Sequence, residues 1–295
     1  MTEEQSYWVA FSAFPGIGPV RFALLRRYFG SAKDAWQADV AAIRETHLGE
    51  KLVEQFIAFR RRFSLDDYLA RLEKLGVHVL TLEDPRYPKR LAQIPDAPFV
   101  LSVKAKPTKE KLNLDRAIAI VGTRNITRYG EEVTRTIVKG LVSHGFTIVS
   151  GMAYGVDAAA HQAAIDAGGK TIAVLGCGID IIAPPSNARL YRAMGEQGYG
   201  AIVSEMPVGI KPTKQLFVLR NRIISGLSMG VVVTEGADDS GALITARNAA
   251  EQGREVFAVP GPITSPYSRG PAKLIKAGAK LVETVEDILD ELNYR

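Results

Sequence analysis

The chain has 295 residues, 46% of them apolar and 23% charged, which is enough for one large or two modest globular domains with a substantial core. No window is long and apolar enough to span a bilayer, and the first residues, MTEEQSYW, are too acidic and polar for a secretory signal. The net charge of +5 and the pI of about 9.2 weakly favour a polyanionic partner. A single cysteine excludes an internal disulfide, and the four histidines lack metal-ligand spacing. We therefore expect a cytoplasmic protein without a metal or a cofactor.

The first part of the chain, residues 1–75, is predicted to be a small helical domain. It is rich in Leu, Ala, Phe and Arg at helical spacing. The sequence PGIG at 15–18, followed by Arg21, Arg26 and Arg27, resembles a helix-hairpin-helix, or SAM-like, arrangement whose hairpin amides can hold a DNA phosphate. Many such hairpins are purely structural or contact protein, so both interpretations stay open.

Residues 76–116 are predicted to connect this domain to the α/β domain that follows and to pack on that α/β domain. Prolines at 85, 88, 95, 98 and 107 interrupt the segment, which favours irregular structure with one or two short strands. The basic run at 104–111 is expected to be solvated.

Residues 117–295 are predicted to form an α/β domain with a doubly wound, Rossmann-like parallel sheet. Six short apolar runs alternate with segments of helical composition, and such runs without polar alternation are typical of strands buried on both faces. The six runs are AIAIVG, FTIVSG, KTIAVLG, AIVSE, GVVVTE and EVFAVPG. Ligands of such a sheet bind at the carboxyl ends of its strands, where small residues dominate here.

The turn after the first of these strands is a candidate phosphate site. Gly122, Thr123 and Arg124 close the strand just before a helix, where free backbone N–H groups and the positive helix end favour an anion. Arg124 would add a bidentate donor. The alternative is structural, because any doubly wound fold needs a small residue at its first turn.

Two apparent nucleotide motifs fail in their context. Gly169-Lys170-Thr171 resembles the end of a Walker A loop, but residue 164 is Ala and the lysine opens a strand rather than a helix. Gly176-Cys177-Gly178 supplies two glycines of a dinucleotide fingerprint, and residue 181 is Ile. Binding of ATP or NAD is therefore not expected.

Asp157 and His161 are one helical turn apart in GVDAAAH and could form an orienting pair for acid–base chemistry. The structural interpretation is favoured, in which Asp157 caps a helix and His161 is a buried polar residue. Cys177 is expected to be a small buried residue, because its neighbours in sequence are apolar.

A basic stretch between residues 206 and 234 contains no acidic residue, while Lys211, Lys214, Arg220 and Arg222 fall inside it. At its centre, FVLRNR at 217–222 combines an aromatic ring, two guanidiniums and an amide, as a single strand of nucleic acid requires. The alternative is an amphipathic helix with its arginines in water. Because residues two apart diverge on a helix, we expect at least one of the two arginines at a turn or helix start that points into the cleft.

Seven linked motifs resemble the DNA-processing protein A (DprA, also called Smf) family in order and spacing. They are GTRNITRYG at 122–130, SGMAYGVDAAAH at 150–161, TIAVLGCGID at 171–180, SEMPVG at 204–209, FVLRNRIISGLS at 217–228, SGALITA at 240–246 and VFAVPG at 256–261. The resemblance implies an extended Rossmann fold and a homodimer that binds single-stranded DNA. It also implies a non-enzymatic protein that protects incoming DNA and helps the recombinase RecA to load during natural transformation.

By motif position, the resemblance places DNA contacts on nine residues, and Lys214 is added for its charge. The nine are Gly122, Thr123, Arg124, Ser150, Gly151, Phe217, Arg220, Asn221 and Arg222. Thr123 and Val218 stand where the family leads us to expect Ser and Pro. Ala272 stands where many members carry Asn, which argues against a DNA contact from that loop.

The main competing hypothesis is a nucleotide-cleaving enzyme of the lysine-decarboxylase-like (LOG) group, which shares the Rossmann core. Such enzymes carry a PGGxGTxxE loop with a catalytic Glu, whereas this chain reads EGADDSGALIT at 235–245. A purely structural interaction protein is a third possibility, and it would leave the residues at 217–222 without a purpose.

Overall fold

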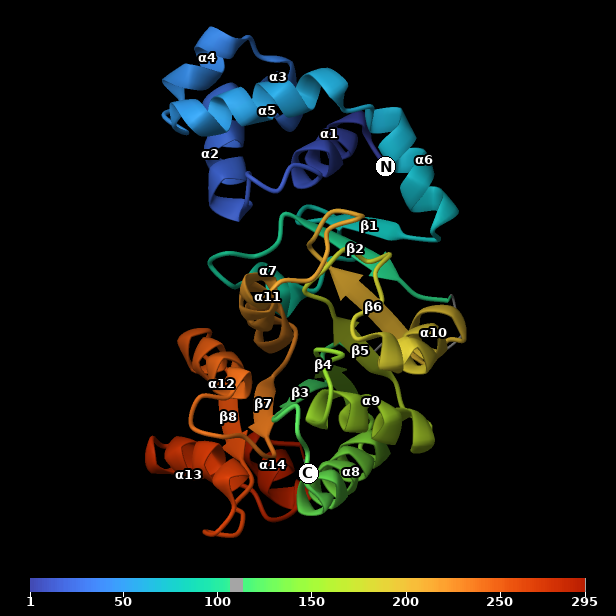
Figure 1. The fold of residues 1–295 in the computed structure, drawn as a ribbon, viewed down its shortest axis with the longest axis vertical. Helices are drawn as coiled ribbons and strands as arrows, with labels where there is room; N and C mark the ends of the chain where they lie inside the picture. Colours follow the sequence, from blue (N-terminus) through green and yellow to red (C-terminus); the bar gives the residue numbers. More distant parts are fainter. Residues whose placement is uncertain (107–113, 295) are drawn as a thin grey trace.

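The computed structural model describes residues 1–106 and 114–294, and these form one nine-stranded sheet with helices on both faces (Figure 1). The strand order is β1-β2-β6-β5-β4-β3-β7-β8-β9. The strands are β1 (His78–Thr81), β2 (Val100–Lys104), β3 (Ala117–Val121), β4 (Thr147–Ser150), β5 (Thr171–Val174), β6 (Gly200–Ser204), β7 (Gly230–Val233), β8 (Glu255–Ala258) and β9 (Lys280–Leu281).

The helices of the N-terminal region and of the segment that connects it to the sheet are α1 (Glu3–Ser12), α2 (Pro19–Phe29), α3 (Ala32–Gln37), α4 (Val40–Glu45), α5 (Glu50–Arg62), α6 (Leu65–Lys74) and α7 (Lys89–Ala92). Those of the α/β region are α8 (Arg128–Ser143), α9 (Val156–Asp166), α10 (Ala188–Glu196), α11 (Lys214–Gly226), α12 (Gly241–Glu251), α13 (Arg269–Lys276) and α14 (Val285–Glu291).

All six predicted strands are present as β3 to β8, and they are parallel to one another. Every residue of β3 to β7 is buried, as the continuous apolar runs predicted. In β3, Ala119 and Val121 pack against one face of the sheet, while Ile118 and Ile120 pack against the other. Because both faces of the strand are covered, these runs lack the polar alternation of a half-exposed strand.

Helices cover both faces, so the predicted doubly wound α/β fold is confirmed. On one face, α7, α11, α12 and α13 contribute to a single apolar cluster. On the other face, α8, α9 and α14 form a second cluster and α10 a third. Between β3 and β7 the chain changes direction across the sheet, and a doubly wound fold binds its ligands outside such a point.

The sheet is larger than predicted and is not parallel throughout. One or two short strands were expected between residues 76 and 116, and two are present, β1 and β2, of which β2 pairs antiparallel with β6. The short strand β9, which the sequence analysis missed, extends the parallel sheet beyond β8. The predicted domain boundaries at 75 and 116 remain predictions.

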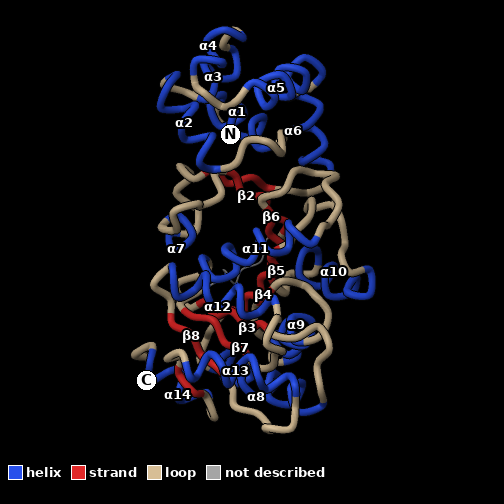
Figure 2. Tube along the Cα trace, turned by 60° about the vertical axis from the view of Figure 1, so that its left-hand side comes forward, coloured by secondary structure: helices blue, strands red, loops and turns tan. Residues whose placement is uncertain are grey.

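The helical region rests on the β1–β2 end of the sheet, far from α13 and α14 (Figures 1 and 2). Its aromatic core includes Trp8, Phe11 and Phe22, and it continues to the start of β2, because the ring of Phe22 stacks on that of Phe99, the residue before the strand, with centroids 4.0 Å apart. Stacked and buried aromatic rings stabilise the contact between the helical region and the sheet.

The predicted hairpin joins α1 and α2, and its arginines have different surroundings. The Arg26 guanidinium lies 4.4 Å from the Trp8 ring centroid and forms an ion pair with Glu83. Arg21 donates a hydrogen bond to the carbonyl of Gly16, while Arg27 is exposed. The hairpin is therefore held by two of its own arginines.

Across the described residues, no helix is both long and apolar enough to cross a membrane. The same part of the chain contains no group of three or more His, Cys, Asp or Glu side chains that could hold a metal ion.

Candidate nucleic-acid interface

The loops at the carboxyl ends of β3, β4, β5 and β7 form one rim, and α11 packs beside it on the face covered by α7 and α12. All ten residues predicted to contact DNA lie in this rim or in α11. The structure divides them into side chains that reach the surface and side chains that are buried.

The loop after β3 is anchored to the end of β7 by Glu235. Its carbonyl accepts a hydrogen bond from the Thr123 amide (2.8 Å), and its carboxylate accepts from the Thr127 amide (3.0 Å) and hydroxyl (2.6 Å). Glu235 is 2% exposed, and the carboxylate lies at the N-terminus of α8, where negative charge is favoured. This residue therefore positions the loop that carries Arg124.

Both predicted glycines are required by close packing inside the rim. A Cβ atom on Gly122 would lie 2.5 Å from Cγ2 of Val156, and one on Gly151 would lie 2.3 Å from Nη1 of Arg220. The Gly151 amide donates to the carboxylate of Asp157 (3.1 Å). A side chain at either position would overlap its neighbours, so packing alone explains both glycines.

Arg220 is buried beneath the rim, with 4% of its surface exposed. Nη1 donates to the carbonyl of Gly151 (2.6 Å) and to the carbonyl of Val174, at the ends of β4 and β5. Burial lowers the pKa of this guanidinium to about 10, with the nearby negative charge of Asp157 opposing the shift. Arg220 thus cross-links two strand ends from below.

Ser150 and Asp157 complete the same buried network. The Ser150 hydroxyl is fully buried and donates to the carbonyl of Ile120 (2.7 Å). The Asp157 carboxylate accepts from the Ala153 amide as well as from Gly151, and its burial raises its pKa. The loop after β4 is therefore held from two sides, by Asp157 and by Arg220.

Phe217 and Arg124 form the part of the predicted site that faces outward. Cζ of Arg124 lies 5.3 Å from the centroid of the Phe217 ring, and Cζ of Arg220 lies 5.9 Å from it. The ring is half-buried and packs on Gly176, where a Cβ atom would lie 2.9 Å from Cδ1 of the ring. Arg124 is exposed, so a charged donor and an aromatic face meet at the surface.

Arg222 and Asn221 point away from this ring. Arg222 forms ion pairs with Asp96 (Nε to Oδ2, 2.7 Å) and Glu205 (Nη2 to Oε2, 2.6 Å). Asn221 is buried and donates to the carbonyl of Gly241 (3.3 Å). These contacts hold α11 against β6 and α12.

The expectation that Arg220 or Arg222 sits at a turn or helix start is wrong, because both lie well inside α11. They diverge as residues two apart on a helix must, one into the rim and one toward β6. The absence of acidic residues between 206 and 234 does not leave Arg222 unpaired, because its partners Asp96 and Glu205 lie outside that stretch of sequence.

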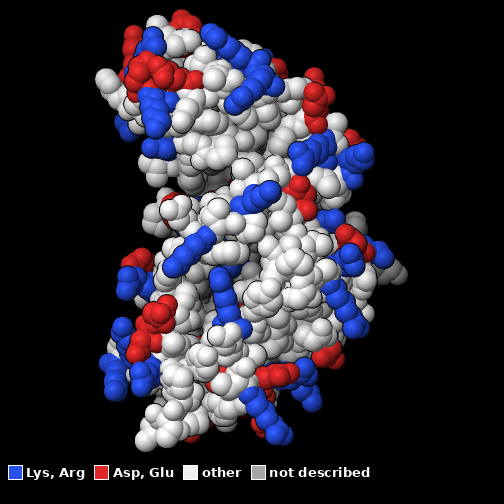
Figure 3. Space-filling view, viewed as in Figure 1, with Lys and Arg blue, Asp and Glu red and all other residues white. Residues whose placement is uncertain are grey.

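Lys211 and Lys214 are the exposed cations of the basic stretch. Among the described residues, neither has a carboxylate within 4 Å. Figure 3 shows separate basic side chains over the middle of the molecule, around α11, with few acidic ones between them. This surface can attract a phosphate backbone.

His161 and Cys177 are buried and do not form an acid–base or nucleophilic site. His161 Nδ1 lies 2.7 Å from Oγ1 of Thr171, which itself donates to the carbonyl of Ile148, so the imidazole carries its proton on Nδ1. Burial raises the pKa of the Cys177 thiol to about 11. The structural interpretation of both residues is the better one, and Asp157 serves the loop rather than the histidine.

Because burial lowers the pKa of His161 to about 3, we expect acid to destabilise the fold through this residue. Between pH 6.5 and 3, His161 is protonated in the unfolded chain but neutral in the folded one. The free energy of unfolding therefore falls as the pH drops below about 6.5, with a slope that approaches about 1.4 kcal/mol per pH unit. Urea unfolding at pH values from about 7 to about 5 tests this. His161→Asn keeps a donor for Thr171 without the titration, so its stability difference from the native chain should shrink as the pH falls. A constant difference would contradict the prediction.

Sequence reasoning missed three residues that build the site: Glu235, Asp157 in its anchoring role, and Gly176. Glu235 was considered only as part of a loop that lacks the PGGxGTxxE motif, and Gly176 only as part of a dinucleotide motif. The usable signal was position for Glu235 and Gly176, since each ends a predicted strand, whereas Asp157 lies in the first turn of the helix that follows one.

Comparison with known proteins identifies relatives over most of the chain. A sequence profile described as DNA recombination-mediator protein A matches residues 78–293. The chain is 40% identical to protein Smf of Synechocystis over 98% of its length and 73% of the relative's. It is 44% identical to the DNA processing protein DprA of Bacillus subtilis, over 82% of this chain and 79% of the relative.

Two solved structures are also similar. The DNA processing protein A of Streptococcus pneumoniae superimposes with a TM-score of 0.81 at 34% identity, covering 99% of this chain and 98% of the other. The protein of the same name from Helicobacter pylori, described with a single-stranded DNA binding mode, gives a TM-score of 0.64 at 29% identity, covering 74% and 95%.

Proposed function

The chain belongs to the DNA recombination-mediator protein A (DprA/Smf) family, and we propose that it binds single-stranded DNA at the rim that contains Arg124 and Phe217. The observation that carries the proposal is the exposed guanidinium of Arg124 beside the half-buried ring of Phe217. An aromatic face for base stacking, next to a guanidinium that donates hydrogen bonds to phosphate, binds a single strand with little dependence on sequence. The binding mode described for the Helicobacter pylori relative supports the same proposal.

The ten predicted contacts then take two roles. Arg124, Lys214 and Phe217 touch the DNA, because their side chains reach the surface. Gly122 and Thr123 shape the turn that presents Arg124, and Gly151 lets the guanidinium of Arg220 approach. Ser150, Arg220, Asn221 and Arg222 hold the strand ends and α11 in place from below.

The alternative of a LOG-like nucleotide-cleaving enzyme requires a catalytic Glu, and Glu235 is the only Glu in the corresponding loop at 235–245. Both of its carboxylate oxygens accept hydrogen bonds from Thr127. Its Oε2 would lie 1.9 Å from a Cβ atom on Gly130, so the carboxylate is packed against α8. We propose a protein without nucleotide-cleaving activity.

We expect tighter binding to single-stranded than to duplex DNA and no release of free base from AMP. Competition between a labelled oligothymidylate and unlabelled duplex measures the first, and chromatography of AMP incubated with the protein measures the second. Tighter duplex binding would count against the proposed site. Release of base that is lost in Glu235→Gln would instead favour the enzyme.

The log–log salt dependence of binding should identify the cations that meet phosphate. Arg124→Ala and Lys214→Ala are each expected to reduce the slope by about 0.7, because one fewer counterion equivalent is released. Lys139→Ala on α8 removes the same charge from another exposed position and should leave the slope unchanged. Equal slopes for all three variants would place the phosphate backbone elsewhere.

We further propose that the protein acts as a homodimer that protects incoming DNA and promotes RecA loading in natural transformation. The family's description as recombination mediators supports this role. Multi-angle light scattering of the purified chain and RecA filament formation on protein-coated single strands would test the two parts separately.

A further inference from the structure

We propose that the cleft between the α1–α2 hairpin and α11 is a second DNA subsite, which holds unstacked bases of the strand bound at Phe217. This inference rests on the proposed function. It assigns a ligand to a cavity that the rim does not include, and it gives the helical region a part in binding.

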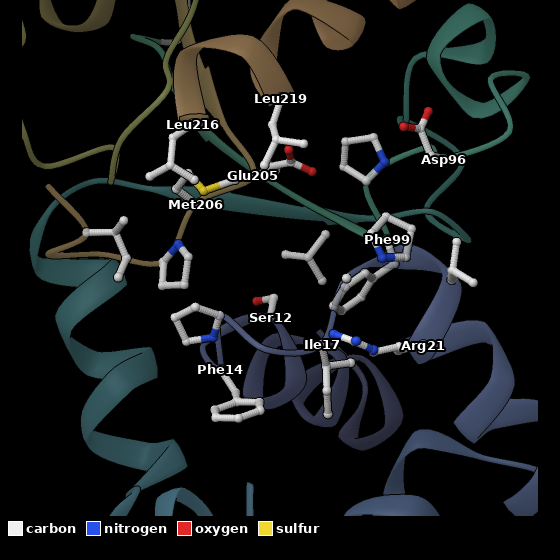
Figure 4. Close-up of a pocket in the computed structure, with 18 of the residues that line it drawn as sticks. Ser12, Phe14, Ile17, Arg21, Asp96, Phe99, Glu205, Met206, Leu216 and Leu219 are labelled. Carbon is white, nitrogen blue, oxygen red and sulfur yellow. The ribbon is translucent and has the colours of Figure 1, made fainter. Parts of the chain in front are cut away.

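The cleft has a volume of about 490 Å³ and is walled by both parts of the chain. Phe14 and Ile17 of the hairpin lie on one side, and Leu216 and Leu219 of α11 point toward them from the other, with Phe99 beside them (Figure 4). Small-molecule pockets have volumes of roughly 300 to 1,000 Å³, so the space suits a nucleobase. The molecule is visibly hollowed at this level, between the helical region and the sheet (Figure 3).

Apolar side chains of this cleft remain in water. Val20 at the start of α2 is 74% exposed, and Leu219 is 53% exposed. A contiguous apolar surface in a concave place marks a binding site more often than a lone exposed residue does. Covering it with flat, apolar bases would remove that surface from water.

The polar groups of the cleft favour a base over a phosphate. Asp96 and Glu205 line it with Arg222, so two carboxylates accompany one guanidinium that already pairs with both. Nη1 of Arg222 is buried and has no acceptor among the described residues. Carboxylates repel phosphate but accept hydrogen bonds from the N–H groups of bases, including N3–H of thymine, and the free N–H of Arg222 can donate to a ring nitrogen or carbonyl of a base.

The cleft is continuous with the proposed site through α11. Leu216 faces the cleft while Phe217, the next residue, faces the rim. Lys214 is the first residue of the same helix and Lys211 lies just before it, where a phosphate backbone passing from one side to the other would meet them. A strand that crosses α11 can therefore place bases on both sides of it.

The test compares Val20→Glu with Leu24→Glu, using labelled oligothymidylates of about 6 and about 20 nucleotides, a range that spans known site sizes. Both residues are exposed apolar positions of α2, one turn apart, and only Val20 lines the cleft. We expect Val20→Glu to weaken binding of the longer strand about five- to tenfold, the lower end of the effect of losing a stacked base. Binding of the shorter strand should be unchanged, and Leu24→Glu should behave as the native chain with both.

The affinity of a strand of the longer length should not change in Val20→Glu if the half that extends beyond the rim carries abasic sites, because that half then has no bases to place in the cleft. If the two variants weaken binding equally, the effect is general repulsion and the subsite does not exist. Unchanged binding of the longer strand by Val20→Glu also overturns the subsite, and would leave the cleft to a protein partner. Failure of the native chain to bind any strand would instead overturn the proposed function. Matching melting curves verify that the variants are folded.

Discussion

Arg220→Ala is expected to lower the free energy of unfolding by about 3–5 kcal/mol, the range for removing one partner of a buried charge pair. The substitution leaves the carbonyls of Gly151 and Val174 without their donor and Asp157 without the opposite charge beside it. It also opens a cavity under Phe217. Urea unfolding followed by circular dichroism measures the effect.

The control for this prediction is Arg124→Ala, which removes a guanidinium from the same site at its exposed side. It should reduce DNA affinity while changing stability little, because surface substitutions stay within about 0.5 kcal/mol. A stable Arg220→Ala protein whose salt slope falls by about 0.7 would show that Arg220 meets phosphate directly. That result would return Arg220 to the role predicted from sequence.

Phe217→Ala is expected to weaken single-stranded DNA binding by about 1–3 kcal/mol, the loss of a base-stacking platform. The salt slope should not change, since no charge is removed. The half-buried ring packs on Gly176, and Cζ of Arg124 and Cζ of Arg220 lie 5.3 Å and 5.9 Å from its centroid, so its orientation is already set before DNA arrives. Titration by fluorescence anisotropy at several salt concentrations gives both quantities.

Two further substitutions separate stacking from packing at the same position. Phe217→Tyr keeps the ring and should bind nearly as the native chain does. Phe217→Leu fills much of the same space without a flat π face, so its affinity should fall almost as far as that of Phe217→Ala. Native affinity in Phe217→Leu would mean that the ring supports α11 and does not stack on a base.

The helical region was predicted correctly as helical, but its relation to the sheet was not predictable. The stacking of Phe22 on Phe99 joins residues 77 positions apart in the sequence. Periodicity reports which face of a helix is apolar and does not report what covers that face. The cleft between hairpin and α11 likewise exists only because three distant segments converge.

The sequence by itself determined the six parallel strands and the doubly wound α/β class, because strands buried on both faces require continuous apolar runs. It also determined the family, because the seven motifs resemble those of the family in order and spacing. It also located the region of the site, since ligands of this fold bind at strand ends. Only the tertiary structure decided which candidate side chains reach the surface. Arg124 and Arg220 look alike in sequence, yet one is exposed and the other is 4% exposed beneath the rim. The reason is physical: the environment of a charged side chain is set by the segments packed around it, and those of Arg220 come from β4, β5 and α9.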